Sequence, residues 1–474
     1  MTKHLLEHPV NRRSFMRFVG VLGAGYSAGT SPKAAQSDAG ARPRISPCLV
    51  GNNVWLNPSD AIWDVASKAG LQLLRIGGIS YDRKMPPSEQ LMDWLRRIKA
   101  MGAEPMIQVS QFRPAQEAAD LVRYFNIEKK LPVRFWNIGN EPWLERKKPP
   151  VATVAPEVAA YVKPIASAMK AVDPAIKIYI PDECDYLDEL YEALIGGSND
   201  VCGKDENNRY YVDGISWHRY VSGNRRWVAA NAAQQFRVRA AKCKSLIDRA
   251  NAAHGRRGAD ALSWGIGEFN LENRGYEGPS AIEGSGVHSF VNGQFHAEVL
   301  GICMKYAASY CATWDIFERN GDRQGTDYSF IDGQGLTPRP SYRHLELVAK
   351  NFRGEYLDGV TNLPDIRAFG CKRSDGFCAM ILNLEDAGTR SYTLRFDDGK
   401  IEGACAINLD GGLMAQYKDA IANQTTQLLV FSGNGMLARK YTYGLDQAKA
   451  GEPPKLEEFT KKVGRSAAAG KSKE

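Results

Sequence analysis

The sequence predicts an α/β protein, a (β/α)8 TIM barrel followed by a small antiparallel β-sandwich domain. Two observations lead to this fold class. Short apolar runs alternate with longer amphipathic runs through the first two thirds of the chain, which is typical of a parallel sheet with crossover helices. Beyond residue 350 the pattern changes to short apolar runs separated by Asp-Gly turns, which favours antiparallel strands.

Eight short apolar runs are expected to form the barrel strands, because strands buried on both faces are short and nearly continuously apolar. They are Ser46–Val50, Leu71–Ile76, Glu104–Val109, Val133–Ile138, Ile176–Ile180, Gly214–His218, Ser263–Glu268 and Ala312–Ile316. The amphipathic runs between them include Ser88–Met101, Ala115–Asn126, Pro156–Val172, Ala230–Ala253 and Asn292–Tyr310. An open doubly wound sheet is the competing fold, but no Gly-x-Gly-x-x-Gly follows an expected strand.

The second domain is expected over residues 351–440, after a barrel over residues 45–350. Its expected strands are Ile366–Cys371, Phe377–Asn383, Ser391–Phe396, Gly403–Leu409 and Gln427–Phe431. Residues 446–474 are rich in small and charged residues and are expected to form a flexible tail.

The net charge of +7 lies at the two ends of the chain. Residues 1–44 carry +5 and residues 450–474 carry +2, so the remainder is close to neutral. Nucleic-acid binding is therefore not expected, because it requires a basic face on the folded body. No run of 18 apolar residues is present, so no membrane span is expected.

The N-terminal segment 1–41 resembles a twin-arginine export signal followed by a linker. Arg12 and Arg13 precede a weakly apolar, Gly-rich run from Phe18 to Thr30, with small residues beyond it. The resemblance implies a bacterial protein that folds first, engages the twin-arginine export machinery and becomes periplasmic or secreted. A chance basic N-terminus is the alternative.

Metal and redox chemistry are not expected. The nine cysteines contain no Cys-x-x-Cys, and most are expected to be buried and reduced, although Cys371 and Cys378 flank a probable hairpin turn and are candidates for pairing. The seven histidines contain neither His-x-His nor His-Glu-x-x-His. We therefore expect no metal and no cofactor.

Chemistry-bearing residues follow the expected strands, at the barrel edge where such folds carry their sites. Arg75 ends the second strand, Asn140 and Glu141 follow the fourth, His218 and Tyr220 the sixth, Glu268 the seventh and Trp314 the eighth. Two opposed carboxylates with aromatic neighbours are what cleavage of a glycosidic bond needs, one as acid and the other as nucleophile. Glu272 is the nearest alternative to Glu268.

Two further features lie near these strand ends. The segment Asn270–Phe290 is Gly-rich and carries Tyr276, Glu283 and His288, so it either sets specificity or forms a passive lid. Arg219, Arg225 and Arg226 are candidates for binding a uronic acid or a sulfated sugar, although a solvated loop is the favoured interpretation.

The motif Ile138-Gly139-Asn140-Glu141-Pro142, with a glutamate ending the seventh strand, resembles the large clan of retaining (β/α)8 glycoside hydrolases. Arg75-Ile76-Gly77-Gly78 resembles the β-glucuronidase and heparanase families. Ser216-Trp217-His218-Arg219-Tyr220 resembles the β-xylosidase and α-L-iduronidase families. The α-L-arabinofuranosidase families are also similar in these finer features. Neither match singles out one family.

The resemblance implies a role for each residue. Glu141 would be the acid/base and Glu268 the nucleophile of a double displacement. Asn140 would contact the sugar 2-hydroxyl, while Arg75, His218 and Tyr220 would position the nucleophile and sugar, and Trp314 would floor the sugar subsite. The expected function is thus an exported retaining glycoside hydrolase acting on a carbohydrate; the alternatives are a non-catalytic carbohydrate-binding barrel and a transglycosylase using the same glutamates.

Overall fold

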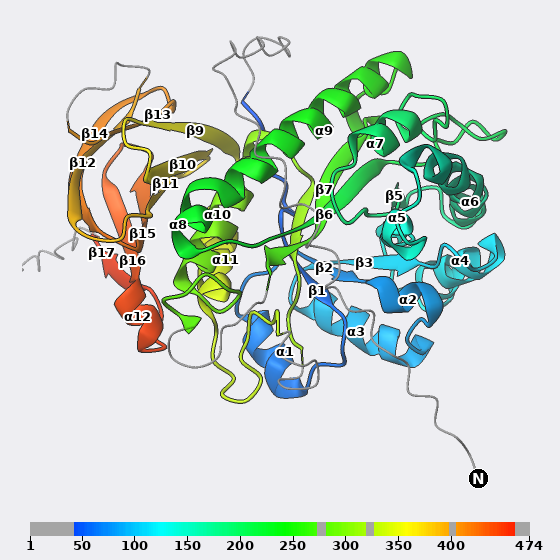
Figure 1. Ribbon diagram of the computed structural model, residues 1–474, viewed down its shortest axis with the longest axis horizontal. Coiled ribbons are helices and arrows are strands. Elements are labelled where there is room, and N and C mark those ends of the chain that lie inside the picture. The colour runs from blue at the N-terminus through cyan, green and yellow to red at the C-terminus, as the bar shows by residue number, and fades with distance from the viewer. Residues whose placement is uncertain (1–41, 273–280, 319–326, 398–403, 460–474) are drawn as a thin grey trace, which may run out of the picture. The chain divides into compact units, whose positions relative to one another are not determined.

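The computed structural model describes residues 42–272, 281–318, 327–397 and 404–459. Eight parallel strands close into a barrel in sequence order, each hydrogen-bonded to the next and the eighth to the first (Figure 1). The strands are β1 Val50–Val54, β2 Leu73–Ile76, β3 Glu104–Val109, β4 Phe135–Ile138, β5 Lys177–Tyr179, β6 Gly214–Val221, β7 Ser263–Leu271 and β8 Tyr310–Thr313. The predicted barrel is confirmed.

Helices connect successive strands. They are α1 Asp60–Ser67, α2 Ile79–Arg83, α3 Ser88–Ala100, α4 Ala115–Val122, α5 Pro142–Glu145, α6 Val151–Val172, α7 Asp188–Leu194, α8 Arg225–Trp227, α9 Ala233–Ala253, α10 Phe290–Lys305 and α11 Pro340–Asn351. Hydroxyl caps begin two of them: the Ser59 side chain accepts from Ile62 N, and the Ser289 side chain accepts from Asn292 N. Among the described helices, none combines the length and hydropathy needed to cross a bilayer.

The barrel interior is layered, because side chains two positions apart on a strand point to the same side. Leu73, Met106, Phe135, Tyr179 and Tyr310 belong to an apolar cluster from five of the strands. Two residues further along β2, β3 and β4 stand the polar residues Arg75, Gln108 and Asn137, all fully buried. The polar layer therefore lies nearer the C-terminal ends of the strands, and the apolar layer lies directly beneath it.

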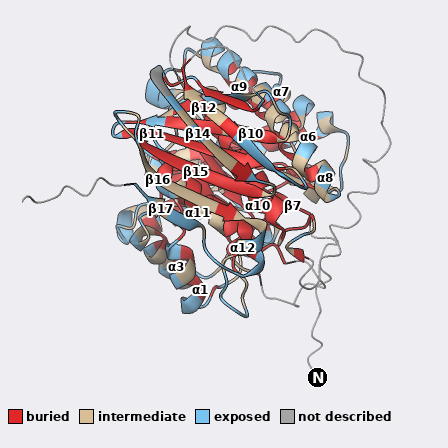
Figure 2. Cartoon of the chain, turned by 90° about the vertical axis from the view of Figure 1, so that its left-hand side faces the viewer, coloured by how far each residue is buried: buried red, intermediate tan, exposed pale blue. Residues whose placement is uncertain are grey.

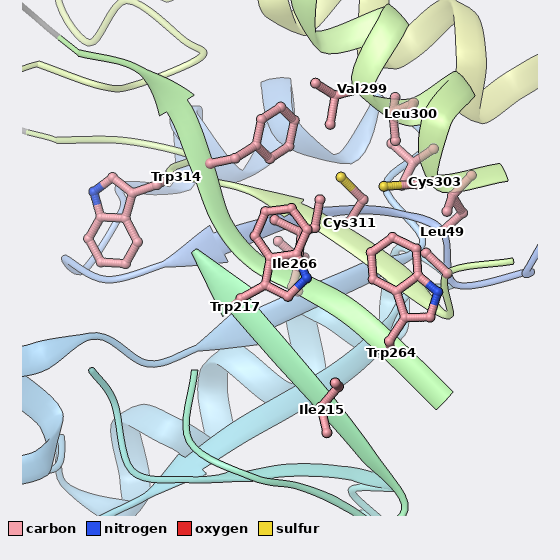
Figure 3. Packing of buried hydrophobic residues seen from close by; sticks show 14 of the residues in the cluster. Leu49, Ile215, Trp217, Trp264, Ile266, Val299, Leu300, Cys303, Cys311 and Trp314 are labelled. Carbon is pink, nitrogen blue, oxygen red and sulfur yellow. The ribbon is translucent and has the colours of Figure 1, made fainter. Parts of the chain in front are cut away.

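Outward-facing residues of the barrel strands are apolar, as β6 and β7 show. Trp217 of β6 and Trp264 of β7 stack with ring centroids 6.3 Å apart, and Figure 3 shows them beside Ile266, Cys311 and Leu300, the last from α10. This packing explains why His218, the residue after Trp217, points into the barrel. Helix α10 is buried almost throughout. Its Gln294 side chain donates to backbone oxygens of the second sheet.

The second sheet has nine strands in the order β14-β12-β13-β9-β10-β11-β15-β16-β17. All neighbouring strands are antiparallel except β12 and β13, which are parallel. The strands are β9 Glu355–Thr361, β10 Ile366–Arg373, β11 Gly376–Asn383, β12 Thr389–Phe396, β13 Ala406–Leu409, β14 Leu413–Ala422, β15 Thr425–Ser432, β16 Leu437–Gly444 and β17 Lys455–Glu458. Figure 2 shows the central strands of this sheet as buried. The sheet has an apolar core that is separate from the core of the barrel. The predicted β-domain is confirmed as one curled sheet.

Several boundaries differ from the expectation. The first strand is Val50–Val54 instead of Ser46–Val50, because Asn52 and Asn53, which interrupt the apolar run, are buried and hydrogen-bonded inside the barrel. Part of the expected tail is ordered: α12 Leu445–Lys449 follows β16, and β17 pairs with β16. Residues 1–41 and 460–474 lie outside the described residues.

All nine cysteines are buried and free. Cys371 and Cys378 stand directly opposite each other on β10 and β11, as the hairpin interpretation expected, but they are not bonded in this structure.

Candidate active site

The guanidinium of Arg75 is the centre of a polar network at the C-terminal ends of the barrel strands. It is fully buried and contacts six residues from five of the strands or their ends. Its hydrogen-bond acceptors are Asn53 Oδ1 (3.0 Å), Gln108 Oε1 (3.2 Å), Asn137 Oδ1 (3.2 Å), Asn140 Oδ1 (2.7 Å) and Glu268 Oε1 (3.1 Å), and it forms an ion pair with Asp182 Oδ2 (2.9 Å). Arg75 therefore fixes the relative positions of most polar groups in the site.

Burial alone would lower the pKa of Arg75, but the carboxylates of Asp182 and Glu268 raise it above its ordinary value. Burial likewise acts to raise the pKa of Asp182, yet Arg75 and His218 lower it overall. The pair is thus ionised in the interior, where each charge depends on the other for its compensation.

Glu268 lies on β7 next to a bulge that the sequence did not reveal. The register between β6 and β7 shifts after Trp217, so that His218 lies opposite Glu268 and Gly267 is left without a partner. Only glycine fits there, since a Cβ at position 267 would lie 2.6 Å from Asp182 Oδ2. Tyr220 donates its hydroxyl to Glu268 Oε2 at 2.8 Å, while Arg75 holds the other oxygen.

Glu141 follows β4 and is held by the neighbouring strand end. Its backbone N–H donates to the carbonyl of Asp182 at 2.6 Å, continuing the parallel pairing that Asn140 makes with Asp182. Glu141 has φ 44° and ψ 54°, in the left-handed region, and Pro142 begins helix α5 immediately after it. The turn directs a buried carboxylate back into the barrel mouth.

His218 joins the two glutamates. Its Nδ1 lies 2.8 Å from Glu141 Oε1 and 3.6 Å from Glu268 Oε2, and its Nε2 lies 3.4 Å from Asp182 Oδ2. Burial would lower the pKa of His218, but Glu268, Asp182 and Glu141 together raise it to about 9. The imidazole is therefore cationic at neutral pH.

Two cationic groups, Arg75 and His218, and two carboxylates, Asp182 and Glu268, lie within ion-pair distance of one another. Glu141 adds a third carboxylate, 2.8 Å from His218 Nδ1.

One side-chain atom each of Glu141, His218 and Glu268 lie within 4.8 Å of one another, a spacing that a metal ion also accepts. A metal would require neutral His218, whereas the surrounding carboxylates favour its protonated form. Arg75, bonded to Glu268, adds a second positive charge beside the same oxygens. The donor set fits an acid/nucleophile pair better than a metal centre.

Trp314 lies just beyond the polar cluster, and its indole donates to Glu318 Oε1 at 3.2 Å. Its ring lies against Gly78, where a Cβ would come within 2.9 Å of it, and against Trp55, with ring centroids 5.9 Å apart. Gly78 N donates to Gln108 Oε1, which also accepts from Arg75, so the aromatic pair borders the charged cluster. The tight contact explains the second glycine of Arg75-Ile76-Gly77-Gly78.

Sequence reasoning missed Asp182, Gln108, Asn137, Asn53 and Trp55. A signal existed for Asp182, because Ile180-Pro181-Asp182-Glu183 ends the fifth strand as Ile138-Gly139-Asn140-Glu141 ends the fourth. Asn53 and Trp55 were missed because the first strand was placed too early. Gln108 and Asn137 lie within strands, where a polar residue reveals its inward direction only once the barrel register is known.

The basic run after β6 is engaged elsewhere. Arg219 forms an ion pair with Asp185, and Arg225 and Arg226 lie beside Asp386. Arg226 is exposed, as the favoured interpretation of a solvated loop expects, whereas Arg219, which lies on β6, and Arg225 are partly buried.

The segment Asn270–Phe290 is described only in part, since residues 273–280, with Tyr276, lie outside the described residues. His288 Nε2 lies 3.1 Å from the carbonyl oxygen of Asp327, and Glu283 pairs with Lys449. Both side chains thus have structural partners, and neither is placed in the charged cluster.

The chain was compared with known protein families, sequences and structures. No protein-family model matches the chain, and no curated protein sequence matches it. Several solved structures are similar to it in fold. The family 51 α-L-arabinofuranosidase AbfB from Bifidobacterium longum matches with a TM-score of 0.54 at 15% identity, over 77% of this chain and 88% of that one.

Two further structures are similar over more of this chain. The GH51 arabinofuranosidase from Xanthomonas axonopodis pv. citri matches with a TM-score of 0.58 at 12% identity, over 88% of this chain and 92% of that one. CelM2, a bifunctional glucanase-xylanase from a metagenome library, matches with a TM-score of 0.58 at 14% identity, over 83% and 97%. The chain therefore has the barrel and β-domain fold of these glycoside hydrolases.

Proposed function

We propose that the protein is a retaining glycoside hydrolase of the same clan, in which Glu141 is the acid/base and Glu268 the nucleophile. The observation that carries this proposal is the approach of the two carboxylates, with one oxygen of each within 4.8 Å of the other. Retaining enzymes place their carboxyl groups roughly 5–5.5 Å apart, whereas inverting enzymes need roughly 6.5–9.5 Å to admit a water.

In the first step, Glu268 attacks the anomeric carbon while Glu141 transfers its proton to the departing glycosidic oxygen. The bond to the leaving group breaks and a glycosyl ester of Glu268 forms. Arg75 and Tyr220 bond to the two oxygens of Glu268, so they hold its carboxylate in place for attack. His218 bonds to Glu141 and stabilises the Glu141 carboxylate that remains once the proton has left.

In the second step, ionised Glu141 takes a proton from water, whose oxygen attacks the anomeric carbon and releases Glu268. Asn140 has a role that its contacts favour: its Oδ1 accepts from Arg75, and its buried Nδ2 has no hydrogen-bond partner among the described residues. An amide donor held in this way is suited to the sugar 2-hydroxyl. Trp55, which is partly exposed, offers flat apolar surface for the sugar ring, and the buried Trp314 packs beside it.

The substrate class is proposed from the same comparisons. Two of the similar structures are arabinofuranosidases and one is a bifunctional glucanase-xylanase. We propose a substrate of the same broad class, an oligosaccharide or polysaccharide with O-glycosidic bonds.

A panel of 4-nitrophenyl glycosides (arabinofuranoside, xyloside, glucuronide, galactoside and glucoside) with matching polysaccharides tests the proposal. Wild type should release product from at least one of them. Glu268→Gln should lose at least ~10³-fold in turnover, since it removes the covalent step. Glu192→Gln, which changes an exposed glutamate of α7, is the matched control and should retain full activity.

Full activity in Glu268→Gln would overturn the assignment of the nucleophile. Binding of these glycans without cleavage would favour a non-catalytic carbohydrate-binding protein. Transfer of the sugar to an added acceptor in preference to water would favour a transglycosylase.

We also propose that residues 1–41 direct export by the twin-arginine machinery. Arg12 and Arg13 form the paired motif on which such signals depend. Replacing both by lysine keeps the charge but removes the motif, so cell fractionation should show the protein retained in the cytoplasm. Export of the double variant at the wild-type level would contradict the proposal.

A further inference from the structure

Both polar groups of the Asn140 backbone are bonded to two side chains from other barrel loops. Its N–H donates to Asp82 Oδ2 at 2.9 Å, and its carbonyl accepts from Gln111 Nε2 at 2.9 Å. Asp82 belongs to α2, after β2, and Gln111 follows β3. The residue that immediately precedes Glu141 is therefore held from two neighbouring strand ends.

Asp82 and Gln111 also bind each other. Gln111 donates from its side chain to Asp82 Oδ2 at 2.7 Å and from its backbone to Asp82 Oδ1 at 3.1 Å. Arg146, just after α5, donates to Gln111 Oε1 at 3.0 Å and to the carbonyl of Pro142 at 3.1 Å. Every polar atom of the Gln111 amide is thus committed, and the contacts close a ring around the turn that carries Glu141.

The turn needs such support, because its backbone is unusual at two positions. Gly139 has φ 82° and Glu141 has φ 44°, both in the left-handed region on either side of Asn140. A non-glycine residue is strained in this region, so surrounding contacts must hold it there. Gln111 also packs against the turn, since a Cβ at Gly139 would lie 2.8 Å from Gln111 Cβ.

Asp82 is 1% exposed and Gln111 is 6% exposed, and their side chains bond to each other, to the Asn140 backbone and to Arg146. Their route to Glu141 is the peptide that aims the acid. We infer that Asp82 and Gln111 are positioning residues, which set the direction from which Glu141 protonates the leaving group. This inference rests on the proposed function.

The leaving group gives the test. Departure of a sugar or alkoxide needs a proton from Glu141, whereas 2,4-dinitrophenolate departs without one. A mispositioned acid therefore slows cleavage of the first kind of substrate and spares the second. A general loss of folding or of sugar binding lowers both to the same extent.

The experiment compares kcat/KM for an alkyl glycoside and a 2,4-dinitrophenyl glycoside of the sugar that the wild type cleaves. Asp82→Asn replaces an acceptor oxygen by an amide facing the donors of Asn140 and Gln111. We expect its kcat/KM to fall ~30-fold or more on the alkyl glycoside and less than ~3-fold on the activated one. Gln111→Met, similar in shape, should show the same selective loss.

Asp93→Asn and Gln116→Met are the matched controls, because both side chains lie on exposed helix faces and bond only within their helices. Both should behave as wild type on either substrate. If Asp82→Asn does not fold, Gln111→Met decides the question.

Equal losses on the two substrates, or no loss on either, would overturn the positioning role while leaving the proposed function intact. Absence of glycoside cleavage by the wild type would overturn both.

Discussion

Arg75 and Asn140 share a hydrogen bond of 2.7 Å, from Nη2 to Oδ1, that determines which way the Asn140 amide points. Because the oxygen is taken by the guanidinium, the amide nitrogen is the atom left for a ligand, and no hydrogen-bond partner for it lies in the part of the chain that the structure describes. The oxygen and nitrogen of an amide have nearly the same shape, so either could point to the substrate. The bond from Arg75 fixes the oxygen, and the nitrogen is then the donor that faces the substrate.

The first prediction follows from this orientation. Asn140→Ala should lower kcat/KM by ~10²-fold on the natural sugar, since hydrogen bonds to the 2-hydroxyl strengthen in the transition state. On the corresponding 2-deoxy glycoside, which lacks the hydroxyl, the same variant should lose less than ~5-fold. Steady-state kinetics of the four combinations measure the coupling, and equal losses on both glycosides would contradict the role of Asn140.

Arg75 should be essential for stability as well as for activity. Arg75→Met leaves Asp182 and Glu268 buried without their shared cation, and breaking a buried pair in this way costs ~3–5 kcal/mol. Urea unfolding measures the loss. Arg249→Met, at an exposed ion pair with Glu192, is the control and should cost less than ~1 kcal/mol. A comparable small cost at Arg75 would show that the network does not depend on it.

Glu183 makes folding stability depend on pH. Burial, with a smaller contribution from Glu141, raises the pKa of Glu183 from 4.5 to about 8, although the Trp143 backbone N–H opposes this. As pH rises above 4.5, the unfolded chain loses this proton while the folded protein keeps it until about pH 8. The stability present below pH 4.5 is therefore lost across this window.

Glu183→Gln cannot titrate, so it should gain stability relative to wild type as pH rises, by on the order of a few kcal/mol near pH 8.5 and almost none of this gain near pH 4.5. Thermal or urea unfolding at the two pH values measures the change, with Glu192→Gln as an exposed control. A difference between Glu183→Gln and wild type that is the same at both pH values would contradict the buried neutral acid.

Gly267 should not tolerate a side chain. A methyl group there would lie 2.6 Å from Asp182 Oδ2, so Gly267→Ala must displace Asp182 or straighten the bulge that brings Glu268 opposite His218. We expect a loss of ~10²-fold in kcat/KM in a folded protein, because small misplacements of catalytic groups are costly. Gly433→Ala, in open space, is the control. Unimpaired turnover in Gly267→Ala would show that the bulge is dispensable.

The sequence predicted the barrel and the residues that end its strands, because strand periodicity and the Asn140–Glu141 and Glu268 positions are local features. It did not predict the support around them. Asp82 and Gln111 act through the backbone of Asn140, and such contacts leave no residue pattern near the motif that they hold. Glu183 looked like an ordinary strand-end acid, since its burial depends on Trp143 and on the packing of the fifth strand.

The His218 pairing shows the same limit. The sequence predicted that His218 stands at the end of the sixth strand. Its place between Glu141 and Glu268 depends on the bulge at Gly267. Because β7 is buried on both faces, it has no alternation of apolar and polar residues in which a one-residue bulge would be visible. Only the three-dimensional pairing shows that His218 joins the two glutamates.

Covalent trapping tests the central claim most directly. The 2,4-dinitrophenyl 2-deoxy-2-fluoro glycoside of the cleaved sugar should inactivate the enzyme, because fluorine slows both displacements whereas the activated leaving group speeds only the first, so the glycosyl-enzyme accumulates. Peptide mapping by mass spectrometry is then expected to find one fluorosugar on Glu268. A label on a different residue, or inverted product with no label at all, would contradict a retaining mechanism through Glu268.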